Sequence, residues 1–442
     1  MQIYLVGGAV RERLLGRPVR ERDFVVVGAS AREMLDLGYR QVGRDFPVFL
    51  HPETQEEYAL ARTLRAGSRD SDGVPYGDPS VSLEEDLARR DLTINALAED
   101  QDGRLIDPFG GERDLRSRLL RHISPAFAED PLRVLRVARF MARYRPLGFR
   151  VAPETRELMG TMAAAGALDG LVAERVWKEL VGALGEGDPP AFFETLRECG
   201  ALVRVLPEID ALFGVPQPVG WHPEVDCGAH TLMALAVACE LSLEAEVRFA
   251  VLTHDLGKAT TPGHILPSHH GHEGRGERLV ERLCRRLKAP AGFRELARRC
   301  AIYHGYTHRL YELRPRTLYK LLCGLDAFRR PTMLERFLLV CESDYRGRQG
   351  FYKRAYPQAG DLWSLYQAAN RVSGEAFAAD EPGWLRGERV RRERIRCIAE
   401  TFSELRDRAD VSAGQAAEDS ETRHVSADER AKAAEEKHQQ GA

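Results

Sequence analysis

The first 110 residues alternate short apolar runs with segments that carry charged residues at helical spacing. The apolar runs are rich in β-branched and aromatic side chains, which is typical of buried strands. They read IYLV, FVVVG, YRQVG, EYALAR and LIDPF. This pattern predicts an α+β head with a small mixed sheet.

From about residue 112 onward, apolar positions recur every three and four residues, as in amphipathic helices. Clear examples are RDLRSRLLRHI, DPLRVLRVARFMARYR, AERVWKELVGALG and AFFETLREC. The stretch 262–274 is rich in glycine and proline, which predicts a loop. Helical patterning continues to about residue 407. The tail 408–442 lacks aromatic and most large aliphatic residues, so we expect it to be disordered.

Composition and charge are those of an ordinary globular protein. Its 442 residues are too many for one compact core, so several domains are expected. The formal net charge of -3 gives no overall basic field, so a polyanion must be bound by local basic clusters. No apolar run is long enough to cross a membrane, and the N-terminus lacks the basic region of a signal peptide. The eight cysteines form no CxxC pair, so we expect reduced thiols in a cytoplasmic protein.

A glycine pair, Gly7 and Gly8, follows the first apolar run, and Arg11 lies on the predicted helix after it. Glycines there let the backbone approach a phosphate, although a tight turn explains them equally well. Glu21 and Asp23 precede the next run, and in a strand their side chains would share one face. Such carboxylates repel unless a cation lies between them, and carboxylate oxygens suit Mg²⁺. A solvated edge neutralised by neighbouring arginines is the alternative.

Two later segments are rich in arginine. In EEDLARRDLTINAL (84–97), Arg89 and Arg90 could hold a triphosphate, and Asp91 could orient them.

In AEDPLRVLRVARFMARYR (128–145), Arg133, Arg136 and Arg139 recur every three residues, so they are predicted to share one helix face opposite the apolar side chains. Three arginines on one face indicate an anionic partner such as a nucleotide and an RNA backbone. A surface salt-bridge lattice is the alternative. Asp130 and Arg133 together could read the edge of a base through hydrogen bonds.

Histidines gather in the second half of the chain. His230 lies in the predicted helix AHTLMALAVACEL, and His254 and Asp255 adjoin in RFAVLTHDLGK. His304 follows in AIYHGYTH, and Asp344 in CESDYRGR. Imidazole and carboxylate groups together form a shell for a divalent metal, and one or two ions could activate water for phosphate ester hydrolysis. The alternative is that these histidines are ordinary core residues. The adjacent His254 and Asp255 make this alternative the weaker one.

Three ordered motifs, GGAVRERLLG…ERDFVVVG, RRDLTINAL and EDPLRVLRVARF, resemble those of the bacterial class II tRNA nucleotidyltransferases. More closely, the chain resembles the multifunctional CCA-adding enzymes with an HD domain, from residue 1 to about 400. This resemblance implies a polymerase-β-like head that adds CCA to tRNA 3′ ends from CTP and ATP without a nucleic-acid template. It also implies a helical body that holds the tRNA acceptor arm.

The same resemblance implies roles for individual residues of the head. Those implied to bind the nucleotide are Gly8, Arg11, Arg90, Arg136 and Arg139. Those implied to select C or A are Asp130 and Arg133, and the Mg²⁺-binding catalytic carboxylates are Glu21 and Asp23.

The histidine-rich segment resembles the HD phosphohydrolase superfamily, whose pattern is H…HD…D. By that match, the metal ligands would be His230, His254, Asp255 and Asp344, with His304 as a further site residue. The implied activities are 2′,3′-cyclic phosphodiesterase, 2′-nucleotidase and phosphatase. We expect a divalent transition metal in this site, with Ni²⁺ as the candidate.

The chain departs from the resemblance at several positions. Glu21 stands where an aspartate is usual, but glutamate is a competent Mg²⁺ ligand, so we expect the transferase to remain active. Glu12 also replaces a usual aspartate. A third acid is expected on a neighbouring strand, and Glu57 is the candidate. Related chains carry His-Asp where this chain has His304-Gly305, so an auxiliary acid is lost, although we expect hydrolase activity to be retained.

We expect tRNA, CTP and ATP as partners, no membrane, and a monomer or homodimer. The basic segment 384–397 could contact tRNA phosphates or form a solvated helix face. Two alternatives remain open: a poly(A) polymerase of the same superfamily, or chiefly an HD phosphohydrolase with a nucleotide- or tRNA-binding head. The predicted division is a nucleotidyltransferase head (1–140), a helical neck and body (141–222), an HD domain (223–350), a C-terminal helical tRNA-contacting region (351–407) and a disordered tail (408–442).

Overall fold

The computed structural model describes residues 1–42, 48–61, 79–373 and 383–406, so the predicted disorder of 408–442 lies outside the described residues. The chain forms two compact units that alternate along the sequence. The boundary between them runs through the histidine-rich part of the sequence. The first unit comprises Met1–Pro216, Asp226–Ala245 and Arg282–Pro290, and the second comprises Gln217–Val225, Glu246–Glu281 and the described residues from Ala291 onward.

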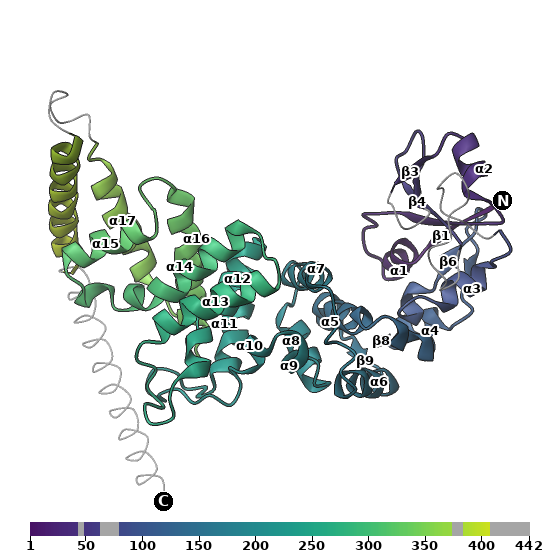
Figure 1. Cartoon of the computed structure of the whole chain (residues 1–442), viewed down its shortest axis with the longest axis horizontal. Helices are drawn as coiled ribbons and strands as arrows, with labels where there is room; N and C mark the ends of the chain where they lie inside the picture. The colour runs from purple at the N-terminus through teal and green to yellow at the C-terminus, as the bar shows by residue number, and fades with distance from the viewer. Residues whose placement is uncertain (43–47, 62–78, 374–382, 407–442) are drawn as a thin grey trace, which may run out of the picture. The chain divides into compact units, whose positions relative to one another are not determined.

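A mixed seven-stranded sheet forms the core of the head (Figure 1). Its spatial order is β3-β4-β5-β2-β1-β6-β7, with β2 antiparallel to β1 and parallel to β5. The central strand β2 therefore has a neighbour on each side. The strands are β1 (Gln2–Val6), β2 (Asp23–Val27), β3 (Arg40–Val42), β4 (Val48–Leu50), β5 (Glu57–Leu60), β6 (Ala98–Glu99) and β7 (Leu105–Ile106).

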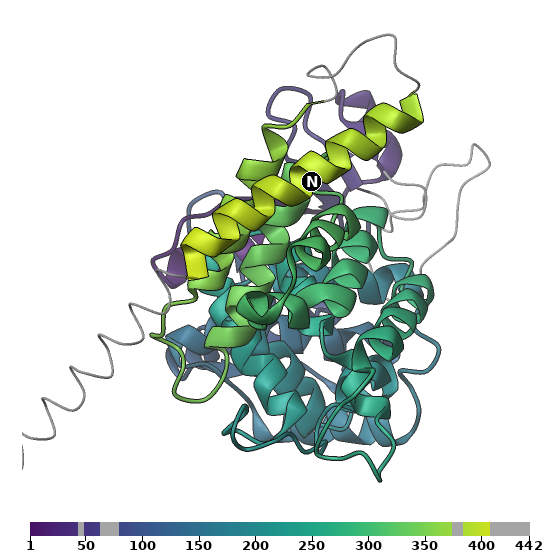
Figure 2. The same cartoon turned by 90° about the vertical axis from the view of Figure 1, so that its left-hand side faces the viewer.

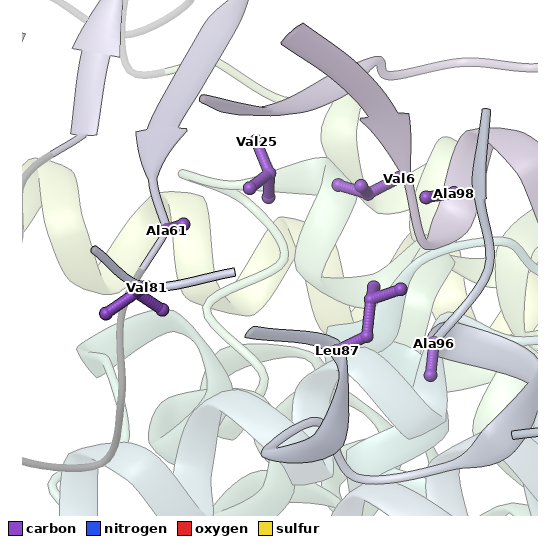
Figure 3. Packing of buried hydrophobic residues seen from close by; sticks show 7 residues of the cluster. All are labelled: Val6, Val25, Ala61, Val81, Leu87, Ala96 and Ala98. Carbon is purple, nitrogen blue, oxygen red and sulfur yellow. The ribbon is translucent and has the colours of Figure 1, made fainter. Parts of the chain in front are cut away.

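Both faces of this sheet are covered, which explains the continuous apolar run in β2. Successive strand residues point to opposite faces, and Val25 and Val26 accordingly pack into two different hydrophobic clusters. Strands buried on both faces show such uninterrupted apolar runs. The cluster around Val25 also contains Val6, Ala61, Val81, Leu87, Ala96 and Ala98 (Figure 3).

One edge of the sheet, where β1 ends and β2 begins, carries the glycine pair and the carboxylates. In the strand register Val6 pairs with Asp23, and Asp23 pairs with Glu57 at the start of β5. Gly7 has a φ of 64°, a left-handed conformation that favours glycine, and it turns the chain into the first helix. Antiparallel pairing of β1 and β2 thus brings two separate sequence motifs to the same edge.

The remainder of the first unit is mostly helical, as the sequence predicted. Helix α5 packs against both α7 and α8. The helices are α1 (Gly8–Leu14), α2 (Ala31–Asp36), α3 (Leu83–Ala88), α4 (Gly111–Arg116), α5 (Leu132–Tyr144), α6 (Pro153–Ala164), α7 (Ala173–Leu184), α8 (Pro190–Glu198), α9 (Leu202–Val205), α10 (Pro207–Asp210) and α11 (Cys227–Leu241). Short 3-10 turns η1 (Thr93–Asn95), η2 (Pro125–Glu129) and η3 (Arg145–Leu147) and a small parallel pair, β8 (Leu119–Leu120) and β9 (Arg150–Val151), complete it.

Beyond residue 245 the described chain is helical, and α14 packs against α16 and α17. The basic segment 384–397 lies in a helix that spans 383–406 (Figure 2). From this helix, Arg394 donates to the carbonyl oxygen of Val372 at 3.2 Å and lies 3.9 Å from the ring centroid of Phe328. The elements are α12 (Ala245–Thr253), η4 (Leu256–Thr260), α13 (His272–Arg286), α14 (Ala291–His308), η5 (Leu310–Glu312), α15 (Pro315–Gly324), α16 (Pro331–Arg346) and α17 (Pro357–Asn370).

This arrangement confirms the predicted fold class, an α+β head followed by helices. Two details differ from the prediction. Because β2 begins at Asp23, Glu21 lies before the strand, and strand alternation does not set its orientation. The loop predicted for residues 262–274 ends earlier than expected, because α13 begins at His272. Within the described residues, every helix is too short or too polar to cross a membrane.

Candidate functional sites

A cleft of about 990 Å³ in the head brings the predicted nucleotide site together. Its walls contain the glycine turn, both carboxylates and arginines from separate parts of the sequence. Glu57 lies beside Asp23 in the sheet but outside the set of residues that line the cleft. The predicted residues that line it are Gly8, Arg11, Glu21, Asp23, Arg90, Asp130, Arg133, Arg136 and Arg139.

Asp91 orients two of these arginines through a buried chain of hydrogen bonds. Its Oδ2 accepts from Nε of Arg136 at 2.8 Å, and its Oδ1 accepts from Nδ2 of Asn95 at 2.7 Å. Oδ1 of Asn95 accepts in turn from Arg11. Burial alone would raise the pKa of Asp91, but Arg136 and Asn95 hold it below its ordinary value, so the carboxylate stays charged. This chain links α1, η1 and α5 within the first unit.

The sequence predicted that Asp91 would orient Arg89 and Arg90, and that prediction is wrong. Asp86 holds them instead, with its oxygens 3.3 Å from Nε of Arg89 and 3.3 Å from Nη2 of Arg90. The reason is helical geometry, because residues three and four positions apart on α3 and its end are neighbours. A Cβ on Gly7 would lie 2.8 Å from Nη1 of Arg90, so only glycine leaves this arginine in place.

The carboxylates at the sheet edge influence one another. Burial raises the pKa of Asp23, Arg90 opposes that shift and Glu21 adds to it, so the pKa lies above its ordinary value. The strand register places Glu57 on the same face of the sheet as Asp23. Carboxylates grouped in this way are oxygen ligands of the kind that Mg²⁺ accepts.

The predicted base-reading pair has protein partners in this structure. Oδ2 of Asp130 accepts from Nη2 of Arg175, on α7, at 2.8 Å. Arg133 donates to the carbonyl oxygen of Ala126 at 3.0 Å and to that of Arg89. Both side chains line the cleft, so a base edge would compete with these partners.

The arginine face predicted on α5 is less open than expected. Arg133 is only 9% exposed, and Nη1 of Arg139 lies 3.3 Å from Oε2 of Glu179. Arg136 is bound to Asp91, as described above. Each arginine therefore has an acceptor within the protein, because α7 and the segment before α5 cover part of the helix face that the sequence predicted to be free.

Glu12, where an aspartate is usual, links α1 to α5. It accepts from the hydroxyl of Tyr144, and its carboxylate lies 3.1 Å from Nη2 of Arg11 and 3.2 Å from Nε of Arg17. Burial acts to raise the pKa of Glu12, but the hydrogen bond from Tyr144 and the charge of Arg11 lower it overall. The residue therefore supports the position of Arg11 in the cleft.

In the second unit, the HD pair lies between α12 and η4. Nε2 of His254 lies 3.1 Å from Oδ2 of Asp255 and 3.8 Å from Oδ1 of Asp344, which comes from α16. Nδ1 of His254 lies 2.7 Å from the carbonyl oxygen of Val251. Burial acts to lower the pKa of His254, but the two carboxylates raise it to about 9. The surroundings of this imidazole are therefore strongly negative, as a cation site requires.

His272 and His304 approach the other oxygen of the same carboxylate. Their Nε2 atoms lie 3.6 and 3.5 Å from Oδ1 of Asp255, and 3.5 Å from each other. His304 was a predicted site residue, whereas His272 was assigned to a loop and given no role. Only its position at the start of α13 brings it to Asp255. Burial lowers the pKa of His272 to about 4, so its ring is neutral at pH 7.

His308 is a second residue that the sequence analysis did not identify. It lies one helical turn after His304 on α14, and its Nε2 donates to Oδ2 of Asp344 at 2.6 Å. The hydroxyl of Tyr356 lies 3.0 Å from its Nδ1. Two histidines four residues apart on one helix share a face, and this spacing was the signal in the sequence.

Two groups of ligand atoms in the second unit are compact enough to hold a metal. One contains Asp255, His272 and His304, the other His254, His304 and Asp344, and within each the ligand atoms lie within 4.8 Å of one another. His230 is buried on α11, which belongs to the first unit. Its predicted role as a ligand therefore stays a prediction.

The resemblance to the HD family led us to expect an aspartate where this chain has Gly305. A Cβ at this position would lie 3.9 Å from Oε1 of Glu273, on α13. The Glu273 side chain is 31% exposed. A carboxylate from a neighbouring helix thus approaches the place of the missing acid.

Three family descriptions match the chain in the order of its motifs. Residues 3–121 match "Poly A polymerase head domain", and residues 148–213 match "Probable RNA and SrmB-binding site of polymerase A". Residues 228–328 match "HD domain". The head, the helical body and the histidine-rich segment are each matched independently.

Solved structures of similar fold include the Bacillus stearothermophilus CCA-adding enzyme in complex with CTP. It has a TM-score of 0.56 and 24% identity, with 93% of this chain and 94% of that chain covered. A tRNA nucleotidyltransferase complexed with a primer tRNA and an incoming ATP analog has a TM-score of 0.53 and 25% identity, with 77% and 91% covered. At such identities the first of these shows the shared fold alone.

Curated relatives match nearly the whole chain. The multifunctional CCA protein of Thioalkalivibrio sulfidiphilus (strain HL-EbGR7) is 60% identical over 406 residues, which cover 91% of this chain and 99% of the relative. The protein of the same name from Alkalilimnicola ehrlichii (strain ATCC BAA-1101 / DSM 17681 / MLHE-1) is 59% identical over 401 residues, 90% of this chain and 97% of the relative. The motif resemblance is thereby confirmed, and the chain belongs to the family of multifunctional CCA proteins.

Proposed function

We propose that the chain adds CCA to tRNA 3′ ends from CTP and ATP without a nucleic-acid template, and that its HD domain is a metal-dependent phosphohydrolase. The observation that carries the transferase proposal is the cleft of the head. It combines a glycine turn, three carboxylates (Glu21, Asp23 and Asp130) and five arginines of the predicted site in about 990 Å³. Membership of the family supplies the substrate class, which the geometry by itself leaves open.

The arginines of the cleft are proposed to bind the triphosphate and ribose of the incoming nucleotide. Asn95 and Asp91 already link Arg11 to Arg136, so these two side chains are oriented before the nucleotide binds. Donors fixed in this way act mainly by positioning and by charge stabilisation, which is how phosphoryl transfer is usually catalysed. The proposed nucleotide-binding residues are Gly8, Arg11, Arg90, Arg136 and Arg139.

Asp23 and Glu21 are proposed to hold Mg²⁺, with Glu57 as a third carboxylate. The donor set fits this ion, because Asp23 and Glu57 are register partners in the sheet and the charge of Glu21 acts to raise the pKa of Asp23. When bound there, Mg²⁺ would lower the pKa of the attacking tRNA 3′-hydroxyl and neutralise charge on the leaving pyrophosphate. The pKa of Asp23, which burial raises, fits a carboxylate whose charge a bound cation would stabilise.

Asp130 and Arg133 are proposed to select the base. An acceptor and a set of donors three residues apart can pair with the hydrogen-bonding edge of cytosine or adenine. In this structure Asp130 is paired with Arg175. To contact a base, Asp130 would have to release Arg175 and accept from the base edge instead. The partners of Arg133 are main-chain carbonyl oxygens, which fix its guanidinium at the cleft wall.

We propose that the helical body binds the tRNA. The match of residues 148–213 to an RNA-binding description supports this role, and a nucleotidyltransferase of similar fold has been solved with a primer tRNA. The predicted segments 141–222 and 351–407 would provide the contacts to the acceptor arm. The basic residues 384–397 lie in the second of these segments.

The HD domain is proposed to hydrolyse 2′,3′-cyclic phosphates, 2′-nucleotides and simple phosphate esters. His254, Asp255 and Asp344 would hold a divalent transition metal together with His230, and imidazole ligands make Ni²⁺ a suitable candidate. These donors fit such an ion, since a buried imidazole lies among two carboxylates. When bound, the metal would supply an activated water.

A transfer assay on tRNA that ends before CCA tests the head. We expect incorporation with CTP alone, and the complete CCA end with CTP and ATP together. Homopolymer formed from ATP alone would instead identify a poly(A) polymerase. Addition of only C, or only A, would show that the three nucleotides are not all added by this chain.

The second alternative is that the protein is chiefly an HD phosphohydrolase. Comparing the transfer and hydrolysis activities of wild type with those of Asp23→Ala distinguishes this alternative from the proposed transferase. We expect transfer to disappear in the variant while hydrolysis of a 2′,3′-cyclic nucleotide is unchanged. Equal and negligible transfer by both proteins would favour a head that only binds its ligands. Loss of hydrolysis in His254→Ala, with transfer retained, would complete the separation of the two activities.

A further inference from the structure

Arg348 is a buried arginine whose guanidinium has no acceptor among the described residues. The residue is 9% exposed, and its Nε is fully enclosed. Arg11, Arg133 and Arg299 are buried to a similar degree, and each donates to an oxygen of the protein. A buried charge without a partner is costly, because the loss of its hydration is not offset. The side chain of Arg348 therefore indicates an anionic ligand.

The position of Arg348 in the chain does not by itself explain the buried charge. Helix α16 ends at Arg346, and a cation near the end of a helix is favoured by the helix dipole. Arg346 has ordinary partners, since its Nη1 lies 2.9 Å from Oε1 of Glu342 and its Nε donates to the carbonyl oxygen of Tyr352 at 2.9 Å. The guanidinium of Arg348, by contrast, donates to none of the described carbonyl oxygens at this helix end.

A series of contacts joins Arg348 to the HD carboxylate Asp344. The guanidinium carbon lies 5.4 Å from the ring centroid of Tyr345, and that ring lies 5.0 Å from the ring of Tyr356. The hydroxyl of Tyr356 lies 3.0 Å from Nδ1 of His308, whose Nε2 donates to Asp344. Arg348 thus lies on the side of the HD pair that α16 and the segment before α17 form.

The charge of Arg348 acts on this side of the HD pair. Burial lowers the pKa of His308, the charge of Asp344 opposes that shift and the charge of Arg348 adds to it, so the pKa lies below its ordinary value. Interactions between charges weaken with distance, so the guanidinium lies close enough to influence a histidine that contacts Asp344. Within the described residues it nevertheless forms no ion pair with a carboxylate.

We infer that Arg348 binds the phosphate group of the ester that the HD domain hydrolyses. A guanidinium presents N–H donors in a planar fork, which matches two oxygens of a phosphate. The imidazole and carboxylate groups of the HD pair suit a cation, so an anionic substrate gains from a separate cationic residue. Arg348 lies outside the H…HD…D pattern. The inference rests on the proposed phosphohydrolase, because it names a residue that recognises the substrate of that enzyme.

Hydrolysis of adenosine 2′-phosphate by the full-length Ni²⁺-loaded protein tests the inference. We expect Arg348→Gln to raise KM about 10- to 100-fold with kcat little changed, as for lost hydrogen bonds to a charged group that form equally in the ground state and the transition state. Arg348→Lys keeps the charge but not the paired donors, so its KM should be intermediate. Arg354→Gln is the matched control, because Arg354 is exposed in the same segment and lies against the ring of Phe351.

Binding of inorganic phosphate tests the same residue without hydrolysis. A ligand of the folded state raises the melting temperature, and the arginines of the head contribute equally to this effect in every variant. We expect phosphate to raise the melting temperature less in Arg348→Gln than in wild type or Arg354→Gln. Titration with Ni²⁺ in the Asp23→Ala background identifies a merely structural role, because a residue that only supported Asp344 would change the metal affinity.

Arg348→Met replaces the glutamine variant if the latter melts at a lower temperature before phosphate is added. An unchanged KM and an unchanged phosphate effect in a folded Arg348 variant would overturn the inference. Equal losses in Arg354→Gln, or a reduced Ni²⁺ affinity in the Arg348 variant, would overturn it as well. If wild type hydrolyses no phosphate ester but the phosphate effect still falls in the Arg348 variant alone, the proposed hydrolase is wrong and the phosphate site stands.

Discussion

Nε2 of His308 donates to Oδ2 of Asp344 at 2.6 Å, and so a residue outside the HD pattern orients one of its carboxylates. The other ring nitrogen of His308 lies 3.0 Å from the hydroxyl of Tyr356. The ring is thus held between α16 and the segment that precedes α17. Groups that orient a metal ligand commonly affect metal affinity nearly as much as the ligand does.

We therefore predict that His308→Ala weakens metal binding by the HD domain about 10- to 100-fold. Isothermal titration with Ni²⁺ in the Asp23→Ala background measures the change. His264→Ala is the control, because His264 is exposed in the segment before α13. Transfer of CMP and AMP by His308→Ala in the otherwise wild-type chain should be normal. An unchanged Ni²⁺ affinity would show that Asp344 is positioned without His308.

Asp91 holds Arg136 and Asn95 together, and its removal should affect both stability and transfer. Asp91→Ala leaves these two partners without their acceptor, which we expect to lower the free energy of unfolding by about 1–3 kcal/mol. Chemical denaturation measures this loss. The transfer rate should fall at saturating CTP as well, because Arg136 loses its orientation.

Asp169→Asn is the control for that experiment. Asp169 forms an exposed ion pair with Arg204, and such pairs contribute less than about 1 kcal/mol. Equal stability losses in Asp91→Ala and Asp169→Asn would contradict the role given to the buried chain of hydrogen bonds. A normal transfer rate in a folded Asp91→Ala would contradict the role of Arg136.

Glu21→Asp should preserve or raise the transfer rate. The substitution keeps the charge and the oxygen ligands but shortens the side chain by one methylene, toward the residue that is usual at this position. Because Glu21 precedes β2, the backbone there is not fixed by strand pairing and can adjust to the shorter residue. Single-turnover transfer of CMP at several Mg²⁺ concentrations measures the effect.

Asp23→Asn provides the contrast, since Asp23 is the first residue of β2 and pairs with Val6 and Glu57 in the register. We expect it to reduce transfer by about 100-fold or more, as for other losses of charge stabilisation in an active site. A large loss of transfer in Glu21→Asp would mean that the site has been rebuilt around the longer glutamate.

The stability of the second unit should depend on pH through Glu295. Hydrogen bonds from Arg330 and Arg299 lower the pKa of Glu295 from 4.5 to about 2. The folded state thus binds this proton more weakly than the unfolded state. The contribution to stability is complete above about pH 4.5 and is lost as the pH falls toward 2.

Glu295→Gln should accordingly melt at a lower temperature than wild type at pH 7, with a smaller difference at pH 3. Glu198→Gln is the control, because Glu198 lies 3.9 Å from Arg156 in a largely exposed pair. Differential scanning calorimetry at both pH values measures the two differences. A melting difference for Glu295→Gln that does not change with pH would refute the assignment.

The local patterns of the sequence determined much of the head and of the body. The apolar run of β2, the glycine after β1 and the helical spacing beyond residue 112 depend on neighbours within a few residues. Those interactions are encoded in short stretches, so the fold class and the order of the motifs were correctly predicted. The motifs themselves also identified the family, because long ordered matches do not depend on tertiary contacts.

Tertiary structure alone decided which of these residues meet. Asp91 binds Arg136, from α5, rather than its sequence neighbour Arg90, which Asp86 holds instead. His272 reaches Asp255 only because α13 begins at that residue. Such contacts join segments far apart in the chain, and their geometry depends on the packing of whole helices. A pattern of residue types along the sequence does not contain that information.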